Sequence, residues 1–213
     1  TLSLHDALPI YTEAITDGVL TDKEQISKSL SIIHSKADQL ETMINDLINY
    51  MKLNNTDWRQ SLEFAPIRPL LDEFKGNVEA TGGVYKRSIK TDIAVSADTK
   101  IKMDKKLLYR ALENIVSNAL RYTKDGDSII VEARESDAAI TISIADTGIG
   151  ISEKDLQRIW DIFYRGSNSR RESGMGIGLS VVRTIIDTHG WDIDVQSKLG
   201  EGTRFTITIP KSA

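Results

Sequence analysis

The sequence contains no cysteine, which excludes disulfide bonds and zinc sites built on thiolates. It contains no apolar run of the length needed to cross a membrane. The net charge is −4 at pH 7, which gives no basis for general nucleic-acid binding. What is present is a chain of 213 residues, 40% of them hydrophobic, with room for one domain and a smaller appendage.

A short stretch with two glycines, Asp146 to Gly150, follows a segment in which apolar and polar residues alternate. Such alternation predicts a half-buried strand over 139–145, which places Asp146 at the strand end. Its carboxylate can accept a hydrogen bond from an exocyclic amine, and Gly148 and Gly150 let the backbone approach a ligand closely. The stretch predicts a ligand contact, although a plain strand-ending turn can have the same residues.

A helix is predicted just upstream, with Asp104 as its N-cap. Its apolar stripe consists of Leu108, Leu112, Ile115 and Ala119. Asn114 and Asn118 are four residues apart, so their amides share one helix face, and Tyr122 continues the row. Asparagine is a poor helix former, so two on one face suggest a function, with capped or solvated amides as the alternative.

A glycine-rich loop containing Gly174, Gly176 and Gly178 leads into an apolar helix predicted over 177–189. Backbone N–H groups at such a place can bind phosphates. The loop is not a P-loop, because no Gly-Lys-Ser/Thr follows, and no strand leads directly into it as in a dinucleotide fingerprint.

Together with two further motifs, these blocks resemble the ATP-binding domain of sensor histidine kinases, in the wider GHKL ATPase group. The five motifs, in order, are an N-box at Asn114 and Asn118, a G1 box at 146–150, an F-box at 162–165, a G2 box from Gly174 to Leu179, and a last glycine pair at 200–203. The resemblance covers nearly everything from Tyr11 to Pro210.

The resemblance implies an α+β fold, a mixed-sheet and helix sandwich of the Bergerat type, over 63–213, after a linker at 56–62. We expect strands at 61–65, 85–93, 100–103, 128–135, 139–145, 192–197 and 204–209, and helices at 66–80, 153–159 and 177–189. The helix at 66–80 is expected to end at Thr81-Gly82-Gly83. His189 lies at the end of a helix, where a protonated imidazole would complement the helix dipole, and it is assigned no catalytic role.

Residues 11–55 are interpreted as a partial dimerisation and phosphotransfer hairpin of two helices. The second helix, N-capped by Thr21, has a heptad seam of Ile26, Leu30, Ile33, Ala37, Leu40, Ile44, Leu47 and Met51. Such a seam favours pairing with a second copy as a four-helix bundle, with an ordinary amphipathic helix as the alternative. His34 lies beside the seam and is interpreted as a polar flank.

Residues 1–10 are expected to be foreign to the protein. His5-Asp6-Ala7-Leu8-Pro9 resembles the family's H-box, His-Asp/Glu-x-x-x-Pro, but is one residue short before the proline. One reverse translation of residues 1–10, ACT CTT TCC CTA CAC GAC GCT CTT CCG ATC, is a widely used short-read sequencing adapter. We therefore expect the native sequence to begin near Tyr11, the H-box to be missing from this chain, and His5 not to be the phosphoacceptor.

The resemblance assigns roles to single residues. Asp146 accepts from the adenine N6 amine and Tyr122 packs on the ring; a solvated Asp and a core Tyr are the alternatives. Asn118 is similar to the family's Mg²⁺ ligand, through its amide oxygen. Asn114 contacts phosphate or a water on Mg²⁺.

Other residues are assigned to the phosphates and the pocket wall. Arg121 and Arg165 are candidates for neutralising phosphate charge, with solvated arginines as the alternative. Gly174, Gly176, Gly178 and Leu179 form the hinge and helix start of a lid at 164–176. Phe163 anchors this lid, with core packing as the alternative. Gly200, Gly202 and Thr203 close the pocket wall, with a tight hairpin turn as the alternative.

The resemblance implies transfer of the ATP γ-phosphoryl to a histidine, then to an aspartate of a response regulator, with Mg²⁺ as cofactor. It implies a homodimer, a cytoplasmic domain and a parent protein in the cell membrane. The alternatives are an ATP-binding module or pseudokinase without this activity, and a GHKL hydrolase. Asn114 argues against a hydrolase, which usually has a general-base Glu there; Glu113 is rotated away by about 100°.

Overall fold

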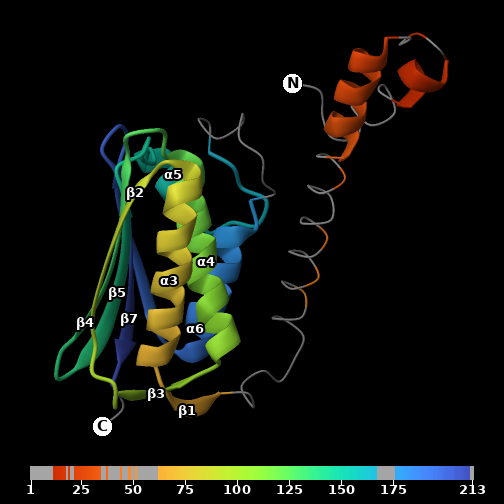
Figure 1. Ribbon diagram of the computed structural model, residues 1–213. Helices are drawn as coiled ribbons and strands as arrows, with labels where there is room; N and C mark the ends of the chain where they lie inside the picture. Colours follow the sequence, from red (N-terminus) through yellow and green to blue (C-terminus); the bar gives the residue numbers. More distant parts are fainter. Residues whose placement is uncertain are drawn as a thin grey trace.

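The computed structural model describes residues 12–17, 19, 22–34, 37, 44, 48, 51, 62–166 and 176–211 (Figure 1). Residues 12–16 and 23–34 are helical, as predicted for the two helices of the hairpin. The predicted cap Thr21, the seam residues Leu40 and Leu47, the linker up to residue 61, Gly174 and residues 1–10 lie outside the described residues.

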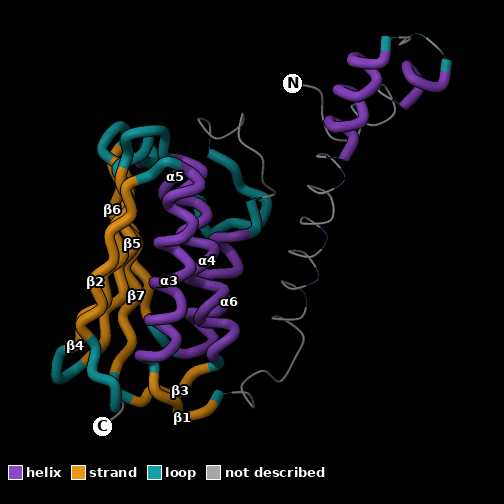
Figure 2. Tube along the Cα trace, in the orientation of Figure 1, coloured by secondary structure: helices purple, strands orange, loops and turns teal. Residues whose placement is uncertain are grey.

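The domain after the linker has two layers, a five-stranded sheet and three long helices on one of its faces (Figure 2). Its elements are β1 (Glu63–Pro66), α3 (Arg68–Tyr85), β2 (Ser88–Ala94), β3 (Lys100–Met103), α4 (Lys105–Tyr122), β4 (Ser128–Glu135), β5 (Ala139–Asp146), α5 (Glu153–Leu156), α6 (Gly178–His189), β6 (Asp192–Lys198) and β7 (Gly202–Pro210). The strand order is β2-β4-β5-β7-β6, with β2 parallel to β4 and the other pairs antiparallel. The predicted α+β sandwich with a mixed sheet is confirmed.

The core lies between the helices and the sheet. All four residues of the predicted apolar stripe on α4 are buried, namely Leu108, Leu112, Ile115 and Ala119. Alternate residues of β4 and β5 meet them, among them Ile129, Val131, Ile140 and Ile142. Because this burial fixes the rotation of α4, it also fixes where the Asn114 and Asn118 row points.

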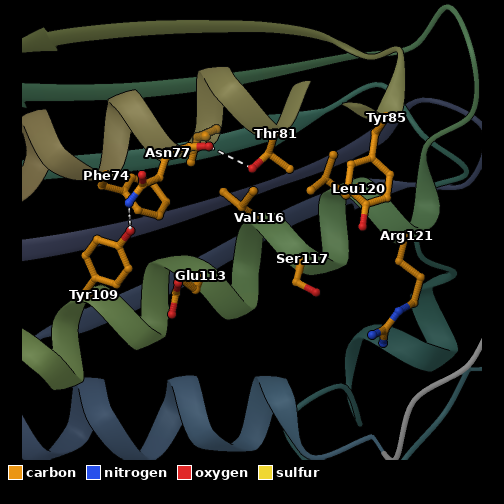
Figure 3. A pocket seen from close by; sticks show the side chains of 11 residues that line it. Phe74, Asn77, Thr81, Tyr85, Tyr109, Glu113, Val116, Ser117, Leu120 and Arg121 are labelled. Atoms are coloured by element: carbon orange, nitrogen blue, oxygen red, sulfur yellow. Dashed lines mark hydrogen bonds between the residues drawn. The ribbon is translucent and has the colours of Figure 1, made fainter. Parts of the chain in front are cut away.

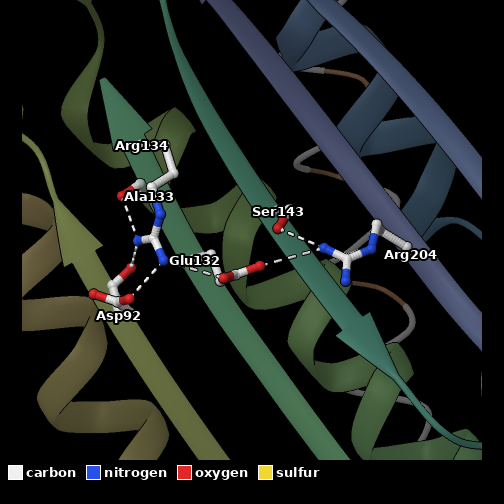
Figure 4. A network of polar contacts seen from close by, with 6 residues as sticks. All are labelled: Asp92, Glu132, Ala133, Arg134, Ser143 and Arg204. Atoms are coloured by element: carbon white, nitrogen blue, oxygen red, sulfur yellow. Dashed lines mark hydrogen bonds and ion pairs between the residues drawn. The ribbon is translucent and has the colours of Figure 1, made fainter. Parts of the chain in front are cut away.

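The other face of the sheet carries a network of polar side chains on four neighbouring strands (Figure 4). Arg134 of β4 pairs with Asp92 of β2 and with Glu132. Arg204 of β7 donates to Ser143 of β5 at 3.0 Å and pairs with Glu132 at 3.4 Å. A face filled with cross-strand polar pairs does not require a second helical layer.

Helix α3 is longer than predicted. It continues through Gly82 to Tyr85 and ends at Lys86, whose φ of 54° is left-handed and whose N–H bonds to the Gly82 carbonyl. The predicted end at Thr81-Gly82-Gly83 and the predicted strand from Tyr85 are therefore wrong. Gly82 serves packing, because a Cβ there would lie 2.8 Å from Cγ1 of Ile89 on β2.

The remaining boundaries agree with prediction within two residues, except at α5. The helix predicted over 153–159 ends at Leu156 and continues as turns. Ser152 caps its start by accepting from the N–H of Asp155.

Candidate functional site

The row of Asn114, Asn118 and Tyr122 lies along one face of α4. Asp104 fixes the start of this helix, since its carboxylate accepts from the N–H groups of Lys106 and Leu107 at 2.9 and 3.1 Å. Asn114, Asn118 and Tyr122 are each partly exposed. Within the described part of the chain, neither asparagine side chain makes a hydrogen bond, so both amide oxygens are available to a ligand.

The G1 loop lies directly against the C-terminal end of α4. Ile149 donates its N–H to the Tyr122 carbonyl at 3.1 Å. A Cβ on Gly148 would lie 2.2 Å from the same oxygen, closer than any side chain permits. The loop therefore reaches this position only with glycine at 148.

Asp146 is the last residue of β5, paired with Ile129 of β4 and Thr203 of β7. Burial raises the pKa of its carboxyl to about 6, and Asp127 nearby adds to this. The backbone amides of Gly148 and Thr203 bond the carboxylate and act in the opposite direction, Gly148 at 2.8 Å. At pH 7 the group is mainly ionised and able to accept from a ligand amine.

Ser197 of β6 joins the G1 loop to the last glycine pair, and sequence reasoning did not identify it. Its Oγ accepts from the Ile151 N–H at 2.8 Å, donates to the Gly202 carbonyl at 2.8 Å and lies 2.9 Å from the Thr203 hydroxyl. Thr203 is buried. Gly150 has a φ of 67° and faces the Lys198 carbonyl, so this wall is held by backbone contacts.

The described part of the G2 box meets α4 and the F-box. Gly178 is the first residue of α6, and a Cβ there would lie 3.3 Å from Oδ1 of Asn114. Gly176 accepts from the Phe163 N–H at 3.0 Å. Phe163 has a φ of 64° and is 58% exposed, so the core-packing alternative is wrong. Leu179 packs against the core and is partly buried.

Arg121 lies at one end of a groove of about 490 Å³ between α3 and α4 (Figure 3). Asn77 of α3 donates to the Tyr109 hydroxyl of α4 at 2.6 Å within this groove. Glu113 and Ser117 also line it, so Glu113 faces away from the Asn114 row, as predicted. Arg165, the last residue of the F-box, is partly exposed.

Arg87 is a further positioning side chain that the sequence did not indicate. Its guanidinium is 13% exposed, pairs with Asp125 at 2.6 Å and donates to the Tyr85 carbonyl at 2.7 Å. It also donates to the carbonyl of Thr123 at 2.7 Å and to its hydroxyl at 3.2 Å. Thr123 follows Tyr122 directly, so Arg87 fixes the C-terminal end of α4, where the row of Asn114, Asn118 and Tyr122 ends.

His189 is neutral, so it does not complement the helix dipole as a protonated imidazole would. Its Nδ1 donates to the Ile185 carbonyl at 2.7 Å, and its Nε2 accepts from the Asp104 N–H at 3.0 Å. Burial lowers the pKa of the ring, and these two bonds fix one neutral tautomer. His189 therefore fastens α6 to the start of α4.

Residues 103–213, just over half of the chain, match the family described as histidine kinase-, DNA gyrase B- and HSP90-like ATPases. The chain belongs to this family. An ATPase domain of this family implies ATP binding.

The curated relatives include the sensor protein SrrB of Staphylococcus aureus strains NCTC 8325 and COL, each 34% identical over 203 residues. The match covers 94% of this chain, which spans about a third of the relatives' length (34%).

Two solved structures share the fold. The histidine kinase AdeS of Acinetobacter baumannii has a TM-score of 0.73 at 21% identity, covering 99% of this chain and 96% of that one. The histidine kinase ThkA, solved with the response regulator TrrA, has a TM-score of 0.74 at 23% identity, covering 98% of this chain and 59% of that one. Together with the sensor protein and histidine kinases to which the chain is similar, the family match confirms the predicted resemblance to sensor histidine kinases.

No described helix is both long and apolar enough to span a bilayer. No cluster of three or more His, Cys, Asp or Glu side chains suited to a metal occurs among the described residues.

Proposed function

We propose that this chain is the ATP-binding part of a two-component sensor histidine kinase. It binds Mg²⁺-ATP and presents the γ-phosphoryl to a histidine, for relay to an aspartate of a response-regulator receiver domain. The observation that carries the proposal is the α4 row, whose Tyr122 end touches the G1 loop and whose Asn114 end touches the start of α6.

The adenine end of the site is formed by Asp146 and Tyr122. The ionised carboxylate accepts from the N6 amine, while the backbone amide of Gly148 holds one of its oxygens in place. Guanine has a carbonyl oxygen at the corresponding position, which the carboxylate repels. The site therefore selects adenine.

The phosphate end is formed by Asn114, Asn118 and the N-terminus of α6. Free N–H groups at a helix start favour anions, and the α6 start lies beside Asn114. The two unbonded amide oxygens fit Mg²⁺, which prefers oxygen ligands and keeps several waters. When bound, Mg²⁺ neutralises charge on the phosphates. The resemblance assigns the neutralisation of phosphate charge to Arg121 and Arg165.

Asn114 also bears on the fate of the phosphoryl group. An amide cannot take a proton from water, so the site favours transfer to a supplied nucleophile over hydrolysis. Three of the six described seam residues, Leu30, Ile44 and Met51, are more than half exposed, while Ile26 and Ile33 are partly buried. The exposed part of the seam supports pairing of the hairpin in a homodimer. We place the parent protein in the cell membrane with this part in the cytoplasm.

The test uses the purified chain and two variants. We expect the wild type to bind Mg²⁺-AMP-PNP in calorimetry, Asn118→Ala to lose the Mg²⁺-dependent part of the affinity, and Ser117→Ala on the groove side to retain it. We also expect no self-labelling by [γ-³²P]ATP. Absence of ATP binding contradicts the proposal, and acid-labile phosphate on His5 contradicts the interpretation of residues 1–10.

A further inference from the structure

Asp155 is a buried carboxylate outside the five motifs. Its side chain is enclosed, with the residue only 7% exposed, in the short helix α5. Oδ2 accepts from the Ser152 hydroxyl at 2.8 Å, and Oδ1 accepts from the Tyr164 hydroxyl at 2.6 Å. A buried carboxylate with two such bonds is held in a single position.

Tyr164 belongs to the F-box and is fixed on three sides. Its hydroxyl bonds to Asp155, its N–H donates to the Asp161 carbonyl at 3.2 Å, and the Arg158 guanidinium lies 4.2 Å above its ring. These contacts determine where the backbone on either side of Tyr164 runs.

The backbone of Phe163 and Tyr164 packs directly against Gly176. A Cβ on Gly176 would lie 2.4 Å from the Tyr164 carbonyl oxygen, and the Phe163 N–H donates to the Gly176 carbonyl at 3.0 Å. Phe163 adopts a left-handed φ of 64°, a strained conformation that persists only when its surroundings hold it. Two residues after Gly176, Gly178 begins α6 beside Asn114.

We propose that Asp155 is a positioning residue for the phosphate end of the site. Through the Tyr164 hydroxyl it holds the F-box backbone against Gly176, and so sets the N-terminus of α6 relative to Asn114. This inference rests on the proposed function, because it takes the start of α6 as the phosphate-binding end. It assigns a role to a carboxylate that never touches the nucleotide.

The test compares two ligands, Mg²⁺-AMP-PNP and adenosine, on wild type, Tyr164→Phe and Asp155→Ala. Loss of a hydrogen bond to a charged group corresponds to about tenfold in affinity. We expect AMP-PNP binding to weaken about tenfold in both variants, while adenosine, which has no phosphates, changes by less than about twofold. Asp155→Asn retains an acceptor for the Tyr164 hydroxyl and should bind nearly as the wild type does.

Tyr109→Phe is the matched control, since its hydroxyl bonds Asn77 in the α3–α4 groove. The Gly178 amide signal in ¹H–¹⁵N spectra is a second readout, expected to move in Tyr164→Phe and not in Tyr109→Phe. The inference, but not the proposed function, would be overturned by any of three results. Both ligands could lose the same affinity in the variants, AMP-PNP binding could stay unchanged, or Asp155→Asn could bind AMP-PNP as weakly as Asp155→Ala does. A wild type that binds neither ligand would overturn the proposed function with it.

Discussion

The carbonyl oxygen of Tyr122 lies 2.2 Å from where a Cβ of Gly148 would be. The end of α4 and the G1 loop thus touch through backbone atoms, and no rotamer change can relieve an added methyl group. We expect Gly148→Ala to lower the free energy of unfolding by about 1–3 kcal/mol and to weaken ATP binding. Urea denaturation and calorimetry measure the two effects.

Gly76→Ala provides the control for this prediction. Gly76 lies on the exposed side of α3, and a Cβ there meets nothing within 4 Å. Alanine is the better helix former, so this variant should gain about 0.5–1 kcal/mol. A Gly148→Ala protein as stable as the wild type would show that the loop can move away from α4.

Asp146→Asn is expected to change base selectivity. The amide can donate to the guanine carbonyl and loses the negative charge that attracts the adenine amine, so ATP should bind about tenfold more weakly and the ATP preference over GTP should narrow. Burial disfavours the charged carboxylate above pH 6, so the variant should melt no lower than the wild type at pH 8. Unchanged selectivity in competition binding would exclude Asp146 from the adenine contact.

The pKa of about 6 at Asp146 also predicts how ATP binding depends on pH. The ionised carboxylate accepts from the adenine amine more strongly than the protonated carboxyl does, so the Kd for AMP-PNP should rise as the pH falls through 6, by up to about tenfold at pH 5. Asp146→Asn, measured over the same range, accounts for titration of the ligand phosphates. Identical pH profiles for the two proteins would contradict the prediction.

His189 gives a pH dependence of stability. Its pKa is below the ordinary value of 6.5, so the stability from its neutral form is complete above pH 6.5 and is lost as the pH falls below that value. His189→Phe keeps a ring against Trp191 but removes both hydrogen bonds, and should be about 1–3 kcal/mol less stable at pH 8. Urea denaturation measures the free energy of unfolding, and the difference between His189→Phe and the wild type should be smaller at pH 5.5 than at pH 8.

Arg87→Ala should be among the most destabilising substitutions of a charged residue. It leaves the partly buried carbonyl and hydroxyl of Thr123 without their donor, at a cost of about 1–3 kcal/mol. Arg183→Ala is the comparison, because its exposed pair with Asp187 contributes no more than about 0.5 kcal/mol. Similar unfolding free energies for the two variants would contradict the assignment of Arg87.

Sequence alone predicted the elements whose signals are local. The Asp104 cap and the apolar stripe define α4, and period-two alternation defines the hairpin of β4 and β5. The predicted end of α3 at Gly82 was wrong because a glycine, taken alone, is a signal for the end of a helix. Its actual reason, the close approach of Ile89, depends on how α3 packs against β2.

The residues that sequence reasoning missed act over long distances in the chain. Arg87 bonds to Thr123 and Asp125, which lie 36 and 38 residues away in the sequence, and Ser197 bonds to Ile151, which lies 46 residues away. No pattern in a single sequence marks such pairs. Asp155 and Tyr164 are only nine apart, yet they lie on a turn whose course no periodicity describes.

Helix α4 is bonded at both ends to side chains from other elements, His189 at its start and Arg87 at its finish. A helix held in this way has little conformational entropy left to lose when a ligand binds. The amide row is thus preorganised, as in a rigid receptor. Loosening either end should therefore appear in calorimetry as a more unfavourable binding entropy, with the enthalpy of the individual contacts nearly unchanged.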